Sequence, residues 1–77
     1  MNNVKRKEIE KITAELEDIK ERIEALQKEE QDAFYNLPLS IQYSERGNVM
    51  QIAINHIEYA AENIQDCLYN LSDALMK

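Results

Sequence analysis

The chain has 77 residues, of which fifteen are acidic and nine are basic, so its net charge is −6. A chain of this length forms one domain at most, and its core is marginally stable unless a disulfide, a metal ion or self-association adds to it. One cysteine and one histidine are too few for a disulfide or a Cys/His metal site, and the excess of acids disfavours general nucleic-acid binding. Self-association is the remaining source of stability.

Residues 5–36 are predicted to form the first helix. Lys, Arg, Glu, Ala, Leu and Ile dominate this stretch, and no Gly or Pro precedes Pro38. We expect residues 1–3 to fray. The basic run Lys5 to Lys7 lies at the start of the helix, where the macrodipole disfavours cations. A basic arm that serves a function is one explanation for this unfavourable placement. Apolar residues alternate three and four apart and predict a coiled-coil seam: Ile9, Ile12, Leu16, Ile19, Ile23 and Leu26.

Residues 37–44 are predicted to connect two helices. Pro38 disfavours the helical conformation at Leu37, so the first helix should end there. Ser44 is a suitable N-cap for the next helix, and Gly47, the only glycine, lies early enough in that helix to cost little. We expect the connector to fold as a lid over one end of the hairpin, with one helical turn, because four of its side chains are apolar: Leu37, Leu39, Ile41 and Tyr43.

The second predicted helix, residues 45–75, carries the widest apolar surface of the sequence. Three heptad registers are filled by apolar or small side chains, which makes a band wider than about 100°. The middle register holds only Ala and Cys, so another backbone can approach closely there, and Cys67 is expected to be a small buried hydrophobe. The registers are Met50, Ile57, Ile64 and Leu71; Ala53, Ala60, Cys67 and Ala74; and Ile54, Ala61, Leu68 and Leu75.

Two helices of similar length and a short connector predict an all-α fold, an antiparallel helical hairpin in a single domain. Because both apolar patterns repeat every seven residues, side chains of the two helices should meet in regular layers along the hairpin. We expect Ile23 and Leu26 to contact Ile57, Leu16 and Ile19 to contact Ile64, and Ile9 and Ile12 to contact Leu71. One partner helix cannot cover the band. We therefore expect a homodimeric four-helix bundle, or a larger oligomer, with the second helices central. The predicted interface comprises Met50, Ala53, Ile54, Ile57, Ala60, Ala61, Ile64, Cys67, Leu68 and Leu71.

The outward side of the second helix is acidic, since no Lys or Arg lies between Gly47 and Met76. Four residues at helical spacing alternate aromatic and carboxylate groups; we call them the outer strip: Tyr59, Glu62, Asp66 and Tyr69. The chain has no glycine-rich phosphate loop and no nucleophile with a base at a recognisable spacing, so we expect neither an enzyme nor a cofactor. His56 with Glu58 could in principle transfer protons, but a histidine at the edge of an interface is the favoured interpretation.

The connector carries a resemblance to a known group of proteins. Leu37-Pro38, Ser40-Ile41-Gln42, Ser44-Glu45-Arg46-Gly47 and Met50 are similar to the corresponding motif in small acidic coiled-coil proteins encoded by phages and other mobile elements of Gram-positive bacteria. The similar stretch covers residues 32–64. Leu39 and Asn48 depart from the pattern, which usually has acids there. The resemblance implies a helical coiled-coil fold and a mobile-element source, and it assigns no active residue.

These observations together predict a non-enzymatic interaction protein. We expect it to bind and occlude a host protein through the outer strip, and to bind neither nucleic acid nor membrane directly. No segment approaches the roughly 18 consecutive apolar residues of a membrane span, so we expect a soluble, cytoplasmic protein. A structural or assembly role, and a surface charge that serves only solubility, remain alternatives. Exposure of the whole outer strip as one co-planar surface would favour occlusion, whereas burial of the strip between protomers would disfavour it.

Overall fold

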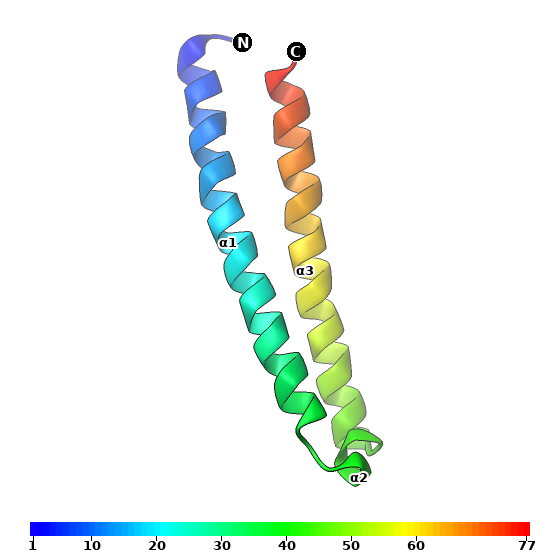
Figure 1. Cartoon of the computed structure of the whole chain (residues 1–77). Coiled ribbons are helices and arrows are strands. Elements are labelled where there is room, and N and C mark those ends of the chain that lie inside the picture. The colour runs from blue at the N-terminus through cyan, green and yellow to red at the C-terminus, as the bar shows by residue number, and fades with distance from the viewer.

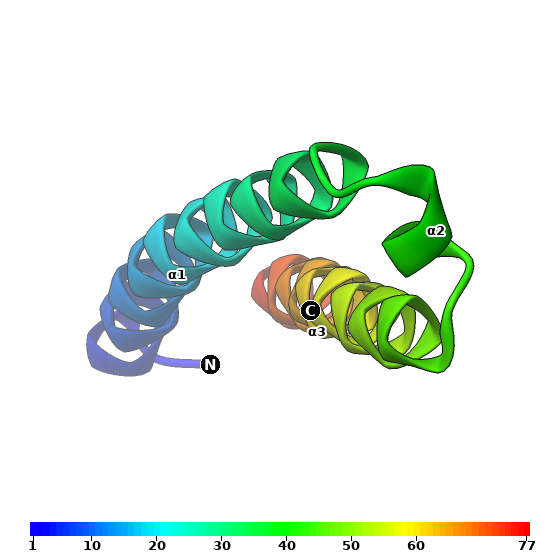
Figure 2. The same ribbon diagram turned by 90° about the horizontal axis from the view of Figure 1, so that it is seen from below.

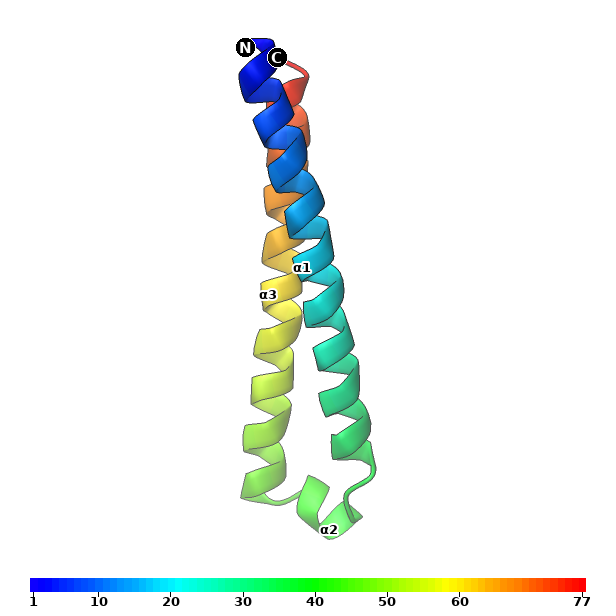
Figure 3. The same cartoon turned by 90° about the vertical axis from the view of Figure 1, so that its left-hand side faces the viewer.

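The computed structural model describes all 77 residues. It contains three helices and no strand. α1 spans Asn3–Tyr35, α2 spans Leu39–Gln42 and α3 spans Glu45–Leu75. The long helices α1 and α3 run antiparallel, with both chain termini at one end and α2 at the other (Figure 1; Figure 3). The radius of gyration is 17.5 Å, against about 11.5 Å for a compact domain of this length. The predicted all-α hairpin is confirmed, and its shape is extended.

The α1 helix begins two residues earlier than predicted because a side chain caps it. The Lys5 backbone N–H donates a hydrogen bond to Asn2 Oδ1 at 2.9 Å, which satisfies one of the N–H groups that a helix start leaves without a partner. Asn3 is therefore helical, and the expected fraying does not reach it.

Arg6, one of the three basic residues at the start of α1, contacts the end of α3. Its Nη1 donates to the Leu75 carbonyl oxygen at 2.6 Å, at the end of α3, whose last turn contains no basic residue. A cation is unfavourable beside the start of its own helix but favourable beside the carbonyl end of a neighbouring antiparallel helix. Arg6 thus has a structural role that the sequence pattern of α1 alone did not indicate.

The connector folds through hydrogen bonds to the ends of both long helices. Gln42 Nε2 donates to the carbonyls of Tyr35 and Leu37 at 3.2 and 2.8 Å, and so closes the end of α1. Ser44 caps α3 as predicted, because its Oγ accepts from the Gly47 N–H at 3.3 Å. Only two of the four apolar side chains of the connector pack against the helices. Leu37 and Ile41 are half-buried, whereas Leu39 and Tyr43 are exposed.

α2 lies against the start of α3 (Figure 2), and Gly47 is the residue of α3 at this contact. It is buried in the first turn of α3, and a Cβ built on it would overlap the carbonyl oxygens of Ile41 and Gln42. The glycine therefore permits a close approach between two backbones. The prediction that this residue matters little because it lies near a helix start misses this contact.

The contact between α1 and α3 is centred on one register of α3. Ile54, Ala61 and Leu68 are buried there, and Phe34 closes the core near the connector. Arg6 lies level with Leu75, and Gln31 Nε2 reaches Gln51 Oε1 at 3.4 Å, which agrees with the predicted stagger of the layers. The residues of α1 that are half-buried along this contact are Arg6, Ile9, Thr13, Leu16, Lys20, Ile23, Gln27 and Gln31.

Half of the predicted seam of α1 does not face α3. Ile12, Ile19 and Leu26 remain 37–47% exposed, because α3 packs one register further round α1, where the polar residues Lys20 and Gln27 lie. Long polar side chains can cover an apolar contact with their methylene stems while the polar ends reach water. The seam is thus divided between the inside of the hairpin and an open surface.

We predict that Gly47→Ala destabilises the hairpin. In an open helix this change stabilises by about 1 kcal/mol, but here the added methyl group must displace the end of α2, and overpacking costs about 1–3 kcal/mol. Thermal unfolding followed by circular dichroism should show a lower midpoint. The neighbouring exposed change Asn48→Ala should leave the midpoint unchanged or slightly higher; a higher midpoint for both variants would contradict the close approach.

We also predict that Arg6→Ala lowers the free energy of unfolding by about 1 kcal/mol, since it removes a charge-assisted hydrogen bond to the end of α3. Arg6→Lys should lose less, because the charge remains near the carbonyl. Lys7→Ala, at an exposed position of the same basic cluster, is the control. Equal urea midpoints for Arg6→Ala and Lys7→Ala would show that the Leu75 contact contributes nothing.

Candidate functional site

One side of the hairpin is an open apolar surface, here called the apolar face. On α1 it contains Ile12, Ile19 and Leu26, and a hollow of about 640 Å³ opens there beside Ile19, Ile23 and Leu26. On α3, two adjacent heptad registers continue it. These registers are half-buried except for the exposed Ala53 and Cys67, and they comprise Met50, Ala53, Ile57, Ala60, Ile64, Cys67, Leu71 and Ala74.

The structure divides the ten predicted interface residues into two groups. Ile54, Ala61 and Leu68 are buried within the hairpin, so they already have a partner surface. The other seven belong to the apolar face. Cys67, which we expected to be buried, is exposed in the single chain, and only a further molecule on the apolar face would bury it.

The single chain exposes more surface than a compact protein of its mass. Its accessible area is 5927 Å², whereas a compact monomer of 9.0 kDa exposes about 4,850 Å². Only five of 77 residues are buried. A core of this size gives little stability to a chain without a disulfide or metal ion.

All four residues of the outer strip are exposed. Tyr59 and Tyr69 expose 51% and 62% of their surface, and Tyr59 packs edge-on against His56 with ring centroids 5.8 Å apart. No hydrogen bond joins His56 to Glu58 or Glu62, so the structure does not form the proton-transfer pair that the sequence allowed.

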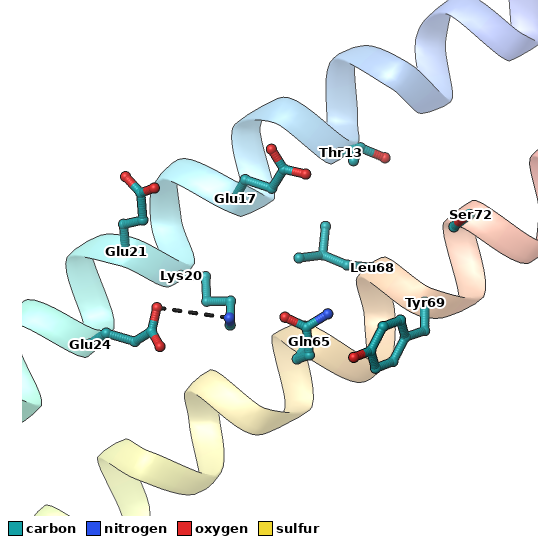
Figure 4. Close-up of a pocket in the computed structure, with 9 residues that line it drawn as sticks. All are labelled: Thr13, Glu17, Lys20, Glu21, Glu24, Gln65, Leu68, Tyr69 and Ser72. Carbon is teal, nitrogen blue, oxygen red and sulfur yellow. Dashed lines mark ion pairs between the residues drawn. The ribbon is translucent and has the colours of Figure 1, made fainter.

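A second surface lies on the opposite side of the hairpin from the apolar face, and we call it the polar groove. It consists of two hollows of about 450 and 280 Å³ that share Lys20, Glu24 and Gln65. Figure 4 shows the larger hollow, with Lys20, Gln65 and Leu68 pointing into the space between α1 and α3. Around each helix, the groove and the apolar face are about 150° apart.

The polar groove is strongly acidic. Lys20 is the one cation that lines it, and five carboxylates surround it, so its net charge is −4 in a molecule of net charge −6. The one ion pair of the molecule joins Lys20 Nζ to Glu24 Oε1 at 3.8 Å, and the other carboxylates of the groove have no cation within 4.0 Å. The carboxylates without such a cation are Glu17, Glu21, Glu58 and Glu62.

The groove overlaps the outer strip only in part. Glu62 and Tyr69 line it, whereas Tyr59 and Asp66 lie further round α3. Sequence analysis found the carboxylates of α3 but not those of α1. The repeat of Glu17 and Glu24 at a seven-residue spacing was the available signal, although its use requires the rotation of α1 to be known.

Comparison of the chain with protein-family models, with functionally characterised proteins and with experimentally determined structures gives no match. No three His, Cys, Asp or Glu side chains converge in an arrangement that would hold a metal ion. Neither long helix is apolar over enough of its length to cross a bilayer.

Proposed function

We propose that this chain is a non-enzymatic interaction protein of phage or mobile-element type, which forms a homodimer and occludes a basic surface of a host protein in the cytoplasm. The observation that carries this proposal is the separation of chemistry between opposite sides of one hairpin. The apolar face suits a second copy of the chain. The outer strip suits a basic partner, because carboxylates steer an oppositely charged surface and tyrosines anchor it.

The accessible area supports the second copy. Two separate chains expose twice 5927 Å², whereas a compact protein of twice the mass exposes about 8,000 Å². Compact pairing would therefore bury about 3,800 Å² in total, which lies in the range of obligate homodimers. A two-fold pairing through the apolar face joins like surfaces and gives a four-helix bundle.

A structural or assembly role is the second candidate, and the closed end of the hairpin favours it. Several large apolar side chains near the connector are exposed and lie outside the apolar face: Tyr35, Leu39, Tyr43, Val49 and Ile52. A second apolar surface of this kind allows association beyond a dimer. Oligomers that grow with protein concentration would favour this role over occlusion.

We predict that the chain sediments as a dimer at micromolar concentration and that Ile19→Glu combined with Leu26→Glu yields a 9.0 kDa monomer. The two side chains are too exposed within one hairpin for the change to prevent helix formation, but it places charges in the middle of the apolar face. Leu39→Glu, at an exposed position near the connector, is the control and should keep the dimer. A wild-type chain that sediments as a stable monomer would refute the pairing.

The outer strip gives a prediction for any partner isolated from a host lysate and then purified. Glu62→Lys and Asp66→Lys should slow association and weaken its salt dependence, since charge steering acts mainly on the on-rate. Tyr59→Ala and Tyr69→Ala should raise the off-rate, and all four changes should alter stability by at most about 0.5 kcal/mol. Surface plasmon resonance measures both rates. Asp73→Lys, an exposed acid of α3 beyond the strip, is the control; binding that survives all four changes would exclude the strip.

A further inference from the structure

We infer that the polar groove is the docking site for one Lys- or Arg-bearing helix of the partner protein, so that both helices of the hairpin contact the partner. This inference rests on the proposed function, since it specifies where and by which chemistry the partner is bound. The outer strip lies on α3 alone, whereas the polar groove would bring α1 into the contact with the partner as well.

The shape of the groove suits a helix. It extends along α1 from Thr13 to Gln27, which corresponds to about 21 Å or four turns of a helix. Leu68 and Ala61 lie at its base between walls of longer side chains, and the small Ala61 allows close approach. The hairpin contains no strand, so it offers no sheet edge to an extended peptide. A helix lying in a groove between two helices is an established mode of recognition for such a surface.

The charge of the groove selects a cationic occupant. Glu17 and Glu24 stand on the α1 side, two turns apart, and Glu58 and Glu62 stand on the α3 side, one turn apart. Lys or Arg residues spaced by four and seven on the occupant would follow the same helical repeat and meet carboxylates of both walls. Such pairs form the strong, charge-assisted class of hydrogen bond.

Two polar side chains within the groove support this assignment independently of the carboxylates. The Lys20 side chain is only 24% exposed, so the groove already holds one cation between the helices. The Thr13 hydroxyl oxygen is buried and has no hydrogen-bond partner, and a buried polar atom in this state costs free energy. A Lys or Arg side chain that displaces the groups covering this oxygen on docking would donate a hydrogen bond to it.

The test uses a labelled synthetic 14-residue helical peptide with Arg at helical spacing and Ala elsewhere, and fluorescence anisotropy measures its Kd. Glu17→Gln combined with Glu58→Gln should raise the Kd about tenfold, because one charge-assisted contact is lost on each wall. The control pair Glu8→Gln and Asp73→Asn removes the same charge at exposed positions outside the groove and should change the Kd less than about twofold. Equal changes in both pairs, or no binding to the wild-type chain, would overturn the inference.

Thr13→Val gives a second measurement that does not alter charge. It should weaken peptide binding without lowering the thermal midpoint, since it removes an unpartnered buried hydroxyl; unchanged binding would contradict a docking role for this end of the groove. The purified natural partner then separates the two proposals. If Tyr59→Ala and Asp66→Lys weaken its binding but the groove pair does not, occlusion stands and the groove inference fails. If neither set has an effect, both fail.

Discussion

Ile54, Ala61 and Leu68 recur every seven residues and are buried against α1, and this line of contact sets the rotation of both long helices about their axes. Once that rotation is fixed, the positions of all other side chains follow from the helical repeat. Ile19 is turned away from α3 on one side, while Glu24 is turned toward the groove on the other. The division into an apolar face and a polar groove is therefore a consequence of which register of α3 contacts α1.

The two ends of the hairpin maintain this arrangement by different means. At the open end, Arg6 binds the last carbonyl of α3 and thereby links the start of one helix to the finish of the other. At the closed end, Gly47 allows α2 to lie directly on α3, and Gln42 holds the end of α1. Sliding of α1 along α3 by one turn would break contacts at both ends, so the stagger is fixed although the central contact is a repeating one.

Periodicity and capping residues predicted the two long helices, the bounds of α3 and the stagger between the helices, because these depend on local sequence and on chain length, whereas α1 begins two residues before its predicted start. The rotation of α1 was not predictable in the same way. Three adjacent registers of α3 are apolar, and nothing local decides which of them contacts α1 or that Lys20 joins the contact. Gly47 is required because α2 meets α3 there, and the polar groove forms because α1 meets α3. Both contacts exist only after folding, so neither could be predicted from one stretch of sequence. The outer strip could be proposed from the sequence because its four residues lie on one helix.

The back-to-back position of the apolar face and the polar groove determines the valence of any assembly built from this hairpin. A two-fold pair joined through its apolar faces would carry two polar grooves that point in opposite directions. One rigid, compact partner domain cannot occupy both grooves, so each dimer would hold two separate partner molecules and gain no avidity from a monomeric one. Partners that are themselves repeated, as in an oligomer or along a filament, would instead be cross-linked, and occupancy would rise with their local concentration.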